Sequence, residues 1–503
     1  MTGTDEHGLK IQKAAEEREL EPLAFCDELS QHFRGLAVKA NISNTRFSRT
    51  TERDHHQAVH HLWRELDSKG LIYKGSHEGW YSISDECFYT DSQIIHVEAT
   101  PSTEEHHIST ETRSRVEWTR EENYKFRLSA FQESLLAHFQ KHPNAIFPPQ
   151  HHSDIIATLS SPMDDLSVSR PSSRLSWGIP VPNDPEHTIY VWIDALTVYL
   201  SATGYPWTAT GGSGKQVGWP PNLQIIGKDI LRFHAIYFPA MLQALGLPLT
   251  QQLLTHSHWT VDQRKMSKSV GNVADPIQAI DEFGIDLVRF YLARVGGRFK
   301  DDVDWSHEQL DKHAREITSL LGNLLMRITS KKIQERTEGK PLTPAAEAFK
   351  HMKEDSPTLP LYQTFQGLGG KVEEKMDQLM LADVLEDIVI TLGKVCASQN
   401  IISVISPFDS TQANQLMTNT APWAATTDTQ TVIELYVCII ECLRICGILL
   451  QPFMPSKAEM LLDALGVPAE ERFIANANLG TGSVGQIQTG IRLFSLPQRQ
   501  KTM

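Results

Sequence analysis

Cysteine is scarce in this sequence: the 503 residues contain six cysteines and no Cys-x-x-Cys pair. Cys438, Cys442 and Cys446 recur at intervals of four residues, which places them on one face of a helix. We expect a reduced, buried apolar stripe there, because a metal site or a disulfide needs sulfurs brought to a common point. Cysteine use of this kind fits a reducing compartment.

Long apolar runs and an excess of basic residues are also absent. No run of about 18 apolar residues suggests a membrane-spanning helix. The formal net charge of −14 argues against a basic nucleic-acid coat protein and leaves any RNA contact to a local basic groove. The start of the chain is too acidic for a targeting peptide. It contains Asp5, Glu6, Glu16, Glu17 and Glu19.

The composition is otherwise ordinary for a globular protein, with 40% hydrophobic and 21% charged residues. The length allows two or three domains, each with a sizeable core. Apolar periodicity predicts helices over residues 10–19, 22–40 and 52–70. Residues 73–90 are rich in aromatic side chains and glycine, which predicts short strands and turns.

Two β-rich runs, residues 188–193 and 223–226, each lead directly into a helical pattern. Repeated strand–turn–helix units indicate a parallel, doubly wound sheet. From about His307 onward helical patterns dominate the sequence. We therefore predict an α/β half and an all-helical half that meet near residue 306.

The segment Lys265-Met-Ser-Lys-Ser269 carries two lysines on a short loop, followed by Gly271 and by Asp275-Pro276, which starts the next helix. When a carboxylate attacks the α-phosphate of ATP, negative charge develops on the phosphate oxygens. Flexible lysines on a mobile loop can close on that charge. The alternative is a solvated surface turn, but the succession of loop, glycine and helix favours phosphate binding.

The segment Thr2-Gly-Thr-Asp-Glu-His-Gly8 is expected to lead from the end of a strand into a helix, where ligands of parallel sheets bind. This segment and Lys265–Ser269 resemble the corresponding motifs of methionyl-tRNA synthetases, class I enzymes of the bacterial and organellar branch. The resemblance extends to about Gly466. It implies a Rossmann-like, doubly wound catalytic domain with an inserted connective domain, followed by an all-α anticodon-binding bundle.

The resemblance divides the chain into five segments. Residues 1–72 and 148–250 correspond to the two halves of the catalytic domain, and 73–147 to the connective insertion. Residues 251–306 correspond to the Lys-Met-Ser-Lys-Ser and stem-contact region, and 307–503 to the anticodon-binding bundle.

Family members open with a strand and a His-x-Gly-His signature upstream of the segment that matches Thr2–Gly8. No His-x-Gly-His occurs in the 503 residues, so the first strand of the sheet is expected to be missing. Two interpretations stay open. The chain is either an N-terminally truncated version of an active enzyme whose true start lies upstream, or a tRNA-binding remnant without catalysis.

The implied reaction has two steps. Methionine and ATP give methionyl-adenylate and pyrophosphate, and the methionyl group then passes to the terminal adenosine of tRNA(Met). Magnesium is the expected companion of ATP. No zinc is expected, because Cys87 stands alone where many relatives hold zinc with paired cysteines. The family branch implies a monomer without a membrane partner, in the mitochondrial matrix or, alternatively, the cytoplasm.

The resemblance also implies roles for individual residues. The catalytic residues would be Lys265, Lys268 and Arg170. Methionine would be bound by Asp5, Trp192, Ala195, Leu196, Tyr199 and His234. ATP would be bound by Gly227, Asp229, Lys265, Ser267 and Lys268. The anticodon would be read by Asn323, Arg327 and Trp423.

These residue types suit those roles chemically. A zwitterionic amino acid in a closed pocket needs an anionic partner for its ammonium group. The polarizable methionine thioether favours aromatic and apolar walls. Amide and guanidinium groups hydrogen-bond the edges of unpaired bases, and an indole ring stacks on their faces.

Each residue also has a simpler structural interpretation. Asp5 and Asp229 could cap helices, Arg170 could be an isolated surface arginine, and His234 could be an ordinary core residue. The aromatic stripe around Trp192 could likewise be plain core. Four histidine pairs are interpreted as surface residues rather than ligands: His55-His56, His60-His61, His106-His107 and His151-His152.

Overall fold

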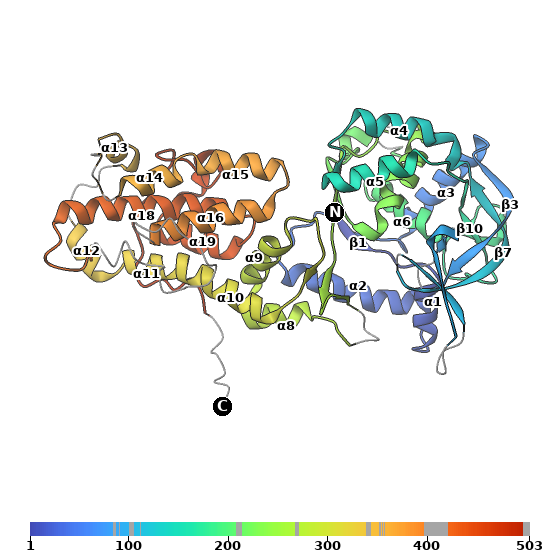
Figure 1. The fold of residues 1–503 in the computed structure, drawn as a ribbon, viewed down its shortest axis with the longest axis horizontal. Helices are drawn as coiled ribbons and strands as arrows, with labels where there is room; N and C mark the ends of the chain where they lie inside the picture. Colours follow the sequence, from blue (N-terminus) through green and yellow to red (C-terminus); the bar gives the residue numbers. More distant parts are fainter. Residues whose placement is uncertain are drawn as a thin grey trace. The chain divides into compact units, whose positions relative to one another are not determined.

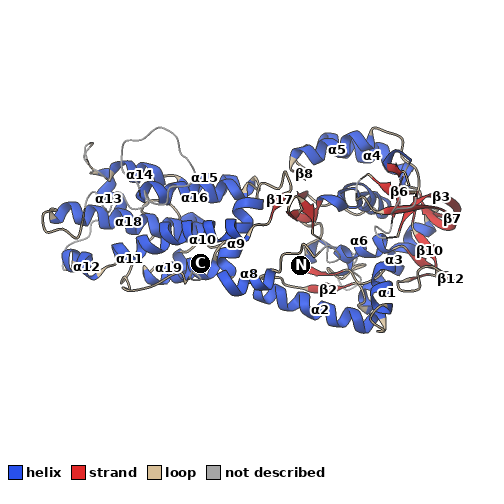
Figure 2. Cartoon of the chain, turned by 60° about the horizontal axis from the view of Figure 1, so that its bottom comes forward, coloured by secondary structure: helices blue, strands red, loops and turns tan. Residues whose placement is uncertain are grey.

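The chain divides into two compact units, residues 1–256 and residues 257–503 (Figure 1). The computed structural model describes residues 1–495 except 84–86, 90, 100–104, 111, 208–213, 267–270, 339–343, 352–353, 355, 357 and 397–420. Strands are concentrated in the first unit, whereas helices dominate the second (Figure 2). None of the described helices is long and apolar enough to cross a membrane.

The first unit begins with a short parallel pair of strands, β1 (Thr2–Thr4) and β2 (Phe47–Arg49). The two backbones approach so closely that a Cβ at Gly3 would lie 1.9 Å from the carbonyl oxygen of Ser48, so only glycine fits there. The three helices predicted in this part of the sequence are confirmed. They are α1 (Leu9–Glu16), α2 (Pro22–Lys39) and α3 (Arg53–Ser68).

An antiparallel sheet follows α3. Its strands are β3 (Ile72–Ser82), β4 (Cys87–Tyr89), β5 (Ile94–Val97), β6 (His106–Ser109) and β7 (Arg115–Phe126). Their order is β4-β3-β7-β6-β5, and the short β9 (Leu166–Ser167) pairs with β7. The long strands β3 and β7 stay in register from Ile72 opposite Phe126 to Tyr81 opposite Glu117. Strands β3 to β7 span residues 72–126 and so overlap the segment 73–147, where the sequence suggests a connective insertion.

A group of parallel strands supports the α/β fold class. It consists of β13 (Leu223–Gly227), β14 (Gln252–His256) and β8 (Ile146–Phe147), in the order β13-β14-β8. The helices next to these strands in the chain are α4 (Gln132–Lys141), α5 (Pro149–Leu159) and α7 (Phe238–Leu245).

One predicted strand–helix unit does not belong to a parallel sheet. β12 (Asp184–Ile189) precedes α6 (Val191–Ser201), as the sequence indicates. However, β12 pairs antiparallel with β10 (Ser169–Pro171) and with β11 (Pro180–Val181). A β-rich run that leads into a helix has the same sequence pattern whichever way the strand pairs, so its direction was not predictable.

Helices α3 and α6 pack against each other, and their buried faces belong to one hydrophobic core. Leu62 and Leu66 from α3 and Ile193 and Leu200 from α6 are all fully buried in it. Burying one such side chain contributes roughly 1.5–3 kcal/mol. This core therefore fixes α6, which carries many of the candidate site residues.

The second unit begins with a small sheet of β15 (Trp259–Val261), β16 (Arg264–Lys265) and β17 (Val303–Asp304). In the sequence, α8 (Pro276–Phe283) and α9 (Ile285–Gly296) lie between β16 and β17. Asp275 caps α8 by accepting a hydrogen bond from the backbone N–H of Ile277, which confirms the predicted helix start. From α10 (His307–Ile317) onward the described elements are helical.

The helices after α10 form a bundle. They are α11 (Leu324–Ile328), α12 (Lys331–Thr337), α13 (Ala345–Lys350), α14 (Leu359–Phe365), α15 (Leu368–Asp377), α16 (Leu381–Cys396), α18 (Thr429–Leu450) and α19 (Pro455–Ala464). Figure 1 shows α16 and α18 side by side, and the two helices are in contact. Cys438, Cys442 and Cys446 on α18 are all buried, which confirms the predicted stripe.

Candidate functional site

The turn between β1 and α1 leaves Asp5 exposed and buries the two residues after it, Glu6 and His7. Gly8 occupies the position before α1, and no side chain caps this helix. The helix-capping interpretation of Asp5 is therefore wrong. Its carboxylate instead lies on the turn that follows a parallel strand, where ligands of such sheets bind.

Glu6 anchors this turn. Its Oε1 accepts hydrogen bonds from Thr4 Oγ1 at 2.6 Å and from Arg49 Nε at 2.7 Å, and its Oε2 accepts one from Thr51 Oγ1 at 2.5 Å. Its carbonyl oxygen accepts a bond from Trp177 Nε1 at 2.7 Å. A carboxylate with this many donors is held firmly, so the backbone of the turn is fixed as well.

Asp194 on α6 joins two histidines from distant parts of the first unit. Its Oδ2 lies 2.6 Å from Nδ1 of His7, and its Oδ1 lies 2.6 Å from Nε2 of His55. Nδ1 of His55 is in turn 2.8 Å from Oγ of Ser201. The Asp194 side chain is only 1% exposed. The turn from β1, helix α3 and helix α6 are thus connected through one buried carboxylate.

The ionisation of this cluster follows from two opposing effects. Burial acts to raise the pKa of Asp194, but the hydrogen bonds from His55 and His7 hold it below the usual value. Burial also acts to lower the pKa of His7, yet its hydrogen bond with Asp194 raises the pKa above the usual value. We infer that His7 and Asp194 form a buried ion pair.

The interpretation of the histidine pairs as surface residues is wrong for His55, which is 2% exposed. The ring of its neighbour His56 lies 5.4 Å from that of His7, and burial together with the His7 charge lowers the pKa of His56 to about 4. A signal for His55 was present in the sequence. It precedes Val59 by one helical turn and so shares the apolar face of α3.

The residues expected to line a methionine pocket lie on α6 and on the π-helical segment Phe233–Tyr237. Trp192 is 7% exposed, its ring centroid lies 5.5 Å from that of Tyr237, and its Nε1 donates to the carbonyl oxygen of Ser167. Leu196 is buried, whereas Ala195 is partly buried. The helix therefore presents a largely apolar wall.

Tyr199 and His234 meet within this wall. The Tyr199 hydroxyl donates to Nε2 of His234 at 2.8 Å, because Nδ1 of His234 donates to the carbonyl oxygen of Ile230 at 3.0 Å. Burial lowers the pKa of His234 to about 4 and raises that of Tyr199 to about 12, so both side chains are neutral near pH 7. An uncharged surface with its polar groups paired suits a thioether.

Arg170 on β10 is 3% exposed, so its interpretation as an isolated surface residue is wrong. Its guanidinium carbon lies 4.1 Å from the ring centroid of Tyr190, 4.7 Å from that of Tyr81 and 4.6 Å from that of Phe88. Each such cation–π contact is worth about 0.5–2 kcal/mol. Aromatic side chains of the antiparallel sheet thus hold this arginine.

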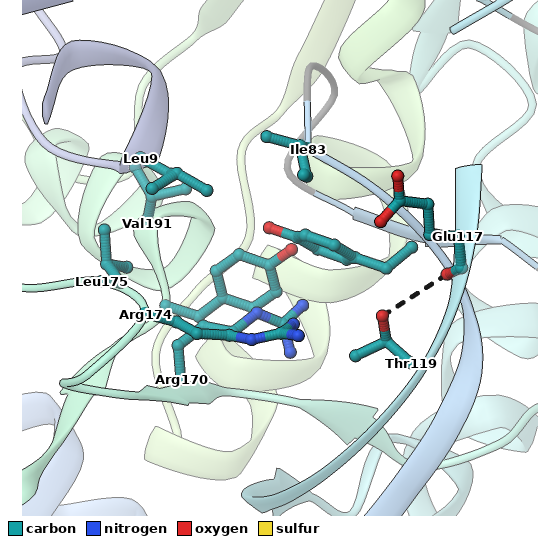
Figure 3. Close-up of a pocket in the computed structure, with 10 residues that line it drawn as sticks. Leu9, Ile83, Glu117, Thr119, Arg170, Arg174, Leu175 and Val191 are labelled. Atoms are coloured by element: carbon teal, nitrogen blue, oxygen red, sulfur yellow. Dashed lines mark hydrogen bonds between the residues drawn. The ribbon is translucent and has the colours of Figure 1, made fainter. Parts of the chain in front are cut away.

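A cavity of about 220 Å³ lies beside Arg170 (Figure 3). Arg170 and Arg174 border it together, and Glu117 of β7 and Ile83, which follows β3, extend toward it. Leu9 of α1 also lines the cavity. Its walls therefore bring together the helix that follows Asp5, strand β10 and the antiparallel sheet. The cavity thus has two cations and one carboxylate among mostly apolar and aromatic lining side chains.

Gly227 and Asp229 lie at the carboxyl end of β13. A Cβ at Gly227 would come within 2.6 Å of Oδ1 of Asp229, so a larger residue would collide with this carboxylate. Gly227, and not Asp229, precedes the helical turn Lys228–Ile230, so the capping interpretation of Asp229 is wrong. Asp229 is exposed at the edge where ligands of parallel sheets bind.

Lys265 ends β16 and is exposed. Its carbonyl oxygen accepts a hydrogen bond from Nδ2 of Asn272 at 3.2 Å, which closes the base of the loop. Gly271 has a φ of +73°, a conformation that favours glycine. Ser267 and Lys268 lie outside the described residues.

The second unit brings Arg327 and Trp423 together. The guanidinium carbon of Arg327 on α11 lies 5.1 Å from the ring centroid of Trp423, whose side chain is 39% exposed. Asn323, one turn before Arg327 along the same helical path, is also exposed. These groups form a partly exposed surface of one amide, one guanidinium and one indole.

Comparison with known proteins identifies the family. The family model described as tRNA synthetases class I (M) matches residues 1–329. The chain is 40% identical over 483 residues to a probable mitochondrial methionine–tRNA ligase of Schizosaccharomyces pombe, covering 95% of this chain and 84% of that protein. The chain belongs to the methionine–tRNA ligase family. The resemblance found in the sequence is confirmed.

Two further members of this family show how far the likeness extends. A methionine–tRNA ligase of Rickettsia prowazekii is 40% identical over 474 residues, covering 94% of this chain and 86% of that protein. A crystal structure of Mycobacterium tuberculosis methionyl-tRNA synthetase bound by methionyl-adenylate superposes with a TM-score of 0.83 at 33% identity, covering 98% of this chain and 91% of the other. The α/β class with a helical C-terminal region is therefore that of the methionine–tRNA ligases.

No zinc was expected in the connective insertion of this chain, because Cys87 stands alone where many relatives have paired cysteines. Among the residues that the structure describes, no group of three or more His, Cys, Asp or Glu side chains is arranged to hold a metal ion. The side chain of Cys87 is not among the described ones.

Proposed function

We propose that this chain activates methionine with ATP and transfers it to tRNA(Met) in mitochondrial translation. The observation that carries the choice of amino acid is the neutral Tyr199–His234 pair beside the Trp192 wall. A buried surface without net charge favours a thioether over a charged side chain, whose desolvation would go uncompensated. ATP as a substrate follows from the class I family to which the chain belongs.

In this proposal the buried network around Glu6 and Asp194 holds the turn that presents Asp5 to the methionine ammonium group. Arg170, held by aromatic rings, supplies positive charge near the carboxylate of Asp5. The methionine side chain lies along Trp192, Ala195, Leu196 and Tyr199, with His234 at the far end. Each role rests on geometry in the first unit and on the family motif that the residue matches.

ATP is proposed to bind at the carboxyl end of β13. Asp229 accepts hydrogen bonds from the ribose hydroxyls, and Gly227 lets the nucleotide approach the backbone closely. Lys265, Ser267 and Lys268 contribute charge and hydrogen bonds to the phosphates as the adenylate forms. Magnesium enters with the ATP phosphates as part of the substrate complex.

The anticodon of the tRNA is proposed to bind at Asn323, Arg327 and Trp423. We further propose a monomer in the mitochondrial matrix. The mitochondrial relatives support this compartment, and a bacterial relative from Rickettsia prowazekii is equally similar in sequence. Immunofluorescence of the native protein against a mitochondrial marker tests the compartment, and sedimentation equilibrium tests the oligomeric state.

Methionine-dependent exchange between ATP and pyrophosphate tests the function directly. In a full-length context, we expect exchange with methionine and not with leucine, and we expect Lys268→Ala to slow it by roughly 10²–10³-fold with little change in methionine affinity. Lys350→Ala, at an exposed position of the bundle, is the matched control and should leave exchange unchanged. Specific tRNA(Met) binding without any exchange would instead support a tRNA-binding protein without catalysis.

A further inference from the structure

The loop that carries Trp423 is held by hydrogen bonds from Arg336, the penultimate residue of α12. Nη1 of Arg336 donates to the carbonyl oxygens of Pro422 at 2.7 Å and Ala424 at 2.6 Å. Nη2 donates to the carbonyl oxygen of Thr427. One guanidinium therefore bonds the backbone on both sides of Trp423.

The loop is also ordered by its own bonds. The N–H of Ala424 donates to the carbonyl oxygen of Ala421 at 2.7 Å, and Oγ1 of Thr427 donates to the same oxygen at 3.0 Å. Asp428 then caps α18 by accepting from the N–H of Thr431 at 2.8 Å. These bonds close the turn. The carbonyl oxygens of Pro422, Ala424 and Thr427 accept from Arg336, and that of Ala424 also accepts from the backbone N–H of Thr427 at 3.2 Å.

Two arginines from consecutive helices thus make different contacts with Trp423 and its loop. Arg327 on α11 lies against the indole ring, with its guanidinium carbon 5.1 Å from the centroid. Arg336 on α12 bonds the backbone that carries the ring. The planar guanidinium with its several donors suits this second task, which the single ammonium group of lysine cannot reproduce.

We propose that Arg336 is a positioning residue for tRNA recognition, which presets the Trp423 loop so that the exposed ring can stack on an unpaired base. Arg336 itself makes no base contact in this proposal. A loop held in its binding geometry loses less conformational entropy when the tRNA binds, so affinity rises without any added contact. The inference rests on the proposed anticodon role of Trp423 and deepens it.

The test measures the dissociation constant of the full chain for tRNA(Met) and for the same tRNA with its three anticodon bases replaced. We compare Arg336→Ala, Arg336→Lys and Trp423→Ala with the original chain. Lys332→Ala is the matched control, because Lys332 is an exposed cation on the same helix as Arg336. It removes one positive charge without removing a bond to the loop.

We expect Trp423→Ala to weaken binding of tRNA(Met) by roughly 5–100-fold, as loss of one stacked base implies. Arg336→Ala should reproduce most of that loss, and Arg336→Lys should recover little of it although the charge is kept. The tRNA with the replaced anticodon should bind all these variants alike. In the Trp423→Ala background, Arg336→Ala should add less than about twofold, because both substitutions act through the same ring.

Several outcomes would overturn the inference. If Arg336→Ala weakens binding of both tRNAs equally, and Lys332→Ala does the same, the effect of Arg336 is generally electrostatic. If the losses of affinity caused by Arg336→Ala and Trp423→Ala simply add, Arg336 acts independently of the ring. If Trp423→Ala weakens binding of tRNA(Met) and Arg336→Ala does not, the positioning role of Arg336 is wrong but the anticodon role of Trp423 stands. If Trp423→Ala leaves the affinity unchanged, the anticodon role is wrong as well. If Arg336→Ala is unfolded at the assay temperature, Arg336→Lys decides by the same criteria.

Discussion

The two candidate sites differ in how their side chains are held. In the first unit Glu6, His7 and Asp194 are each no more than 5% exposed, and each has hydrogen-bond partners. In the second unit Trp423 is 39% exposed, and its ring contacts the Arg327 guanidinium. A small amino acid needs a preformed pocket that excludes water, whereas an RNA loop can be recognised on an open surface.

The difference has an energetic consequence. Removing one partner of a buried ion pair leaves an uncompensated charge and destabilises the fold itself. Removing an exposed ring mainly affects the ligand that would stack on it. Substitutions in the first unit should therefore change stability and activity together, whereas those at Trp423 should change tRNA recognition alone.

The largest effect is expected from Asp194→Ala. The substitution leaves the buried rings of His7 and His55 without their shared partner, which should lower the free energy of unfolding by about 3–5 kcal/mol. Urea denaturation followed by tryptophan fluorescence measures this loss. The matched control is Asp383→Ala, because Asp383 pairs with Arg298 at 3.3 Å and the Arg298 side chain is 71% exposed. A pair of that kind is worth less than about 1 kcal/mol.

The loss caused by Asp194→Ala should also depend on pH. The pKa of Asp194 is lowered in the folded state, so its contribution is present above its usual value of 3.8 and is lost as pH falls through the folded value. The pKa of His7 is raised, so its contribution is complete below 6.5 and is lost as pH rises through the folded value. The difference in the free energy of unfolding between the original chain and Asp194→Ala should therefore be largest between pH 3.8 and pH 6.5. A difference that grows steadily above pH 7 would contradict the ion pair.

A smaller effect is expected from Trp423→Ala, and it should be confined to tRNA. Loss of stacking should weaken aminoacylation of tRNA(Met) by about 1–3 kcal/mol, while methionine-dependent exchange of ATP and pyrophosphate stays nearly intact. Trp423→Phe keeps an aromatic face and should retain most of the activity. Should exchange fall as far as aminoacylation, Trp423 would be a core residue and the contrast between the two units would disappear.

The sequence predicted what depends on local pattern. Helices α1, α2 and α3, the Asp275 cap of α8 and the buried cysteines of α18 all follow from spacing along one element. The buried cluster around Asp194 did not follow, because His7 and His55 are separated from it by 187 and 139 residues. Its local signs were the position of His55 on the apolar face of α3 and a carboxylate within the apolar run of α6, between Ile193 and Leu196.

Arg170 shows the same limit from another side. Its motif match came from the sequence, but its burial depends on Tyr81 and Phe88, which lie on a separate sheet. No periodicity within β10 reports a contact of that kind. Composition also could not show that β12 pairs antiparallel, since strand direction is decided by tertiary packing. The sequence thus identified candidate site residues more readily than it predicted what surrounds them.

The smallest effect is expected from Tyr199→Phe, which tests the neutral pair in the first unit. The substitution removes the hydroxyl that donates to Nε2 of His234, so the free energy of unfolding at pH 7 should fall by about 1 kcal/mol. The pKa of folded His234 is lowered to about 4 from 6.5. The folded protein therefore has the full stability that goes with a neutral His234 above pH 6.5, and it loses stability as pH falls toward 4. Protonated Nε2 cannot accept the Tyr199 hydrogen bond, so this bond contributes nothing once His234 is charged. The difference between the two proteins in urea denaturation should therefore shrink from pH 7 to pH 4, and a constant difference would mean that His234 does not accept from Tyr199.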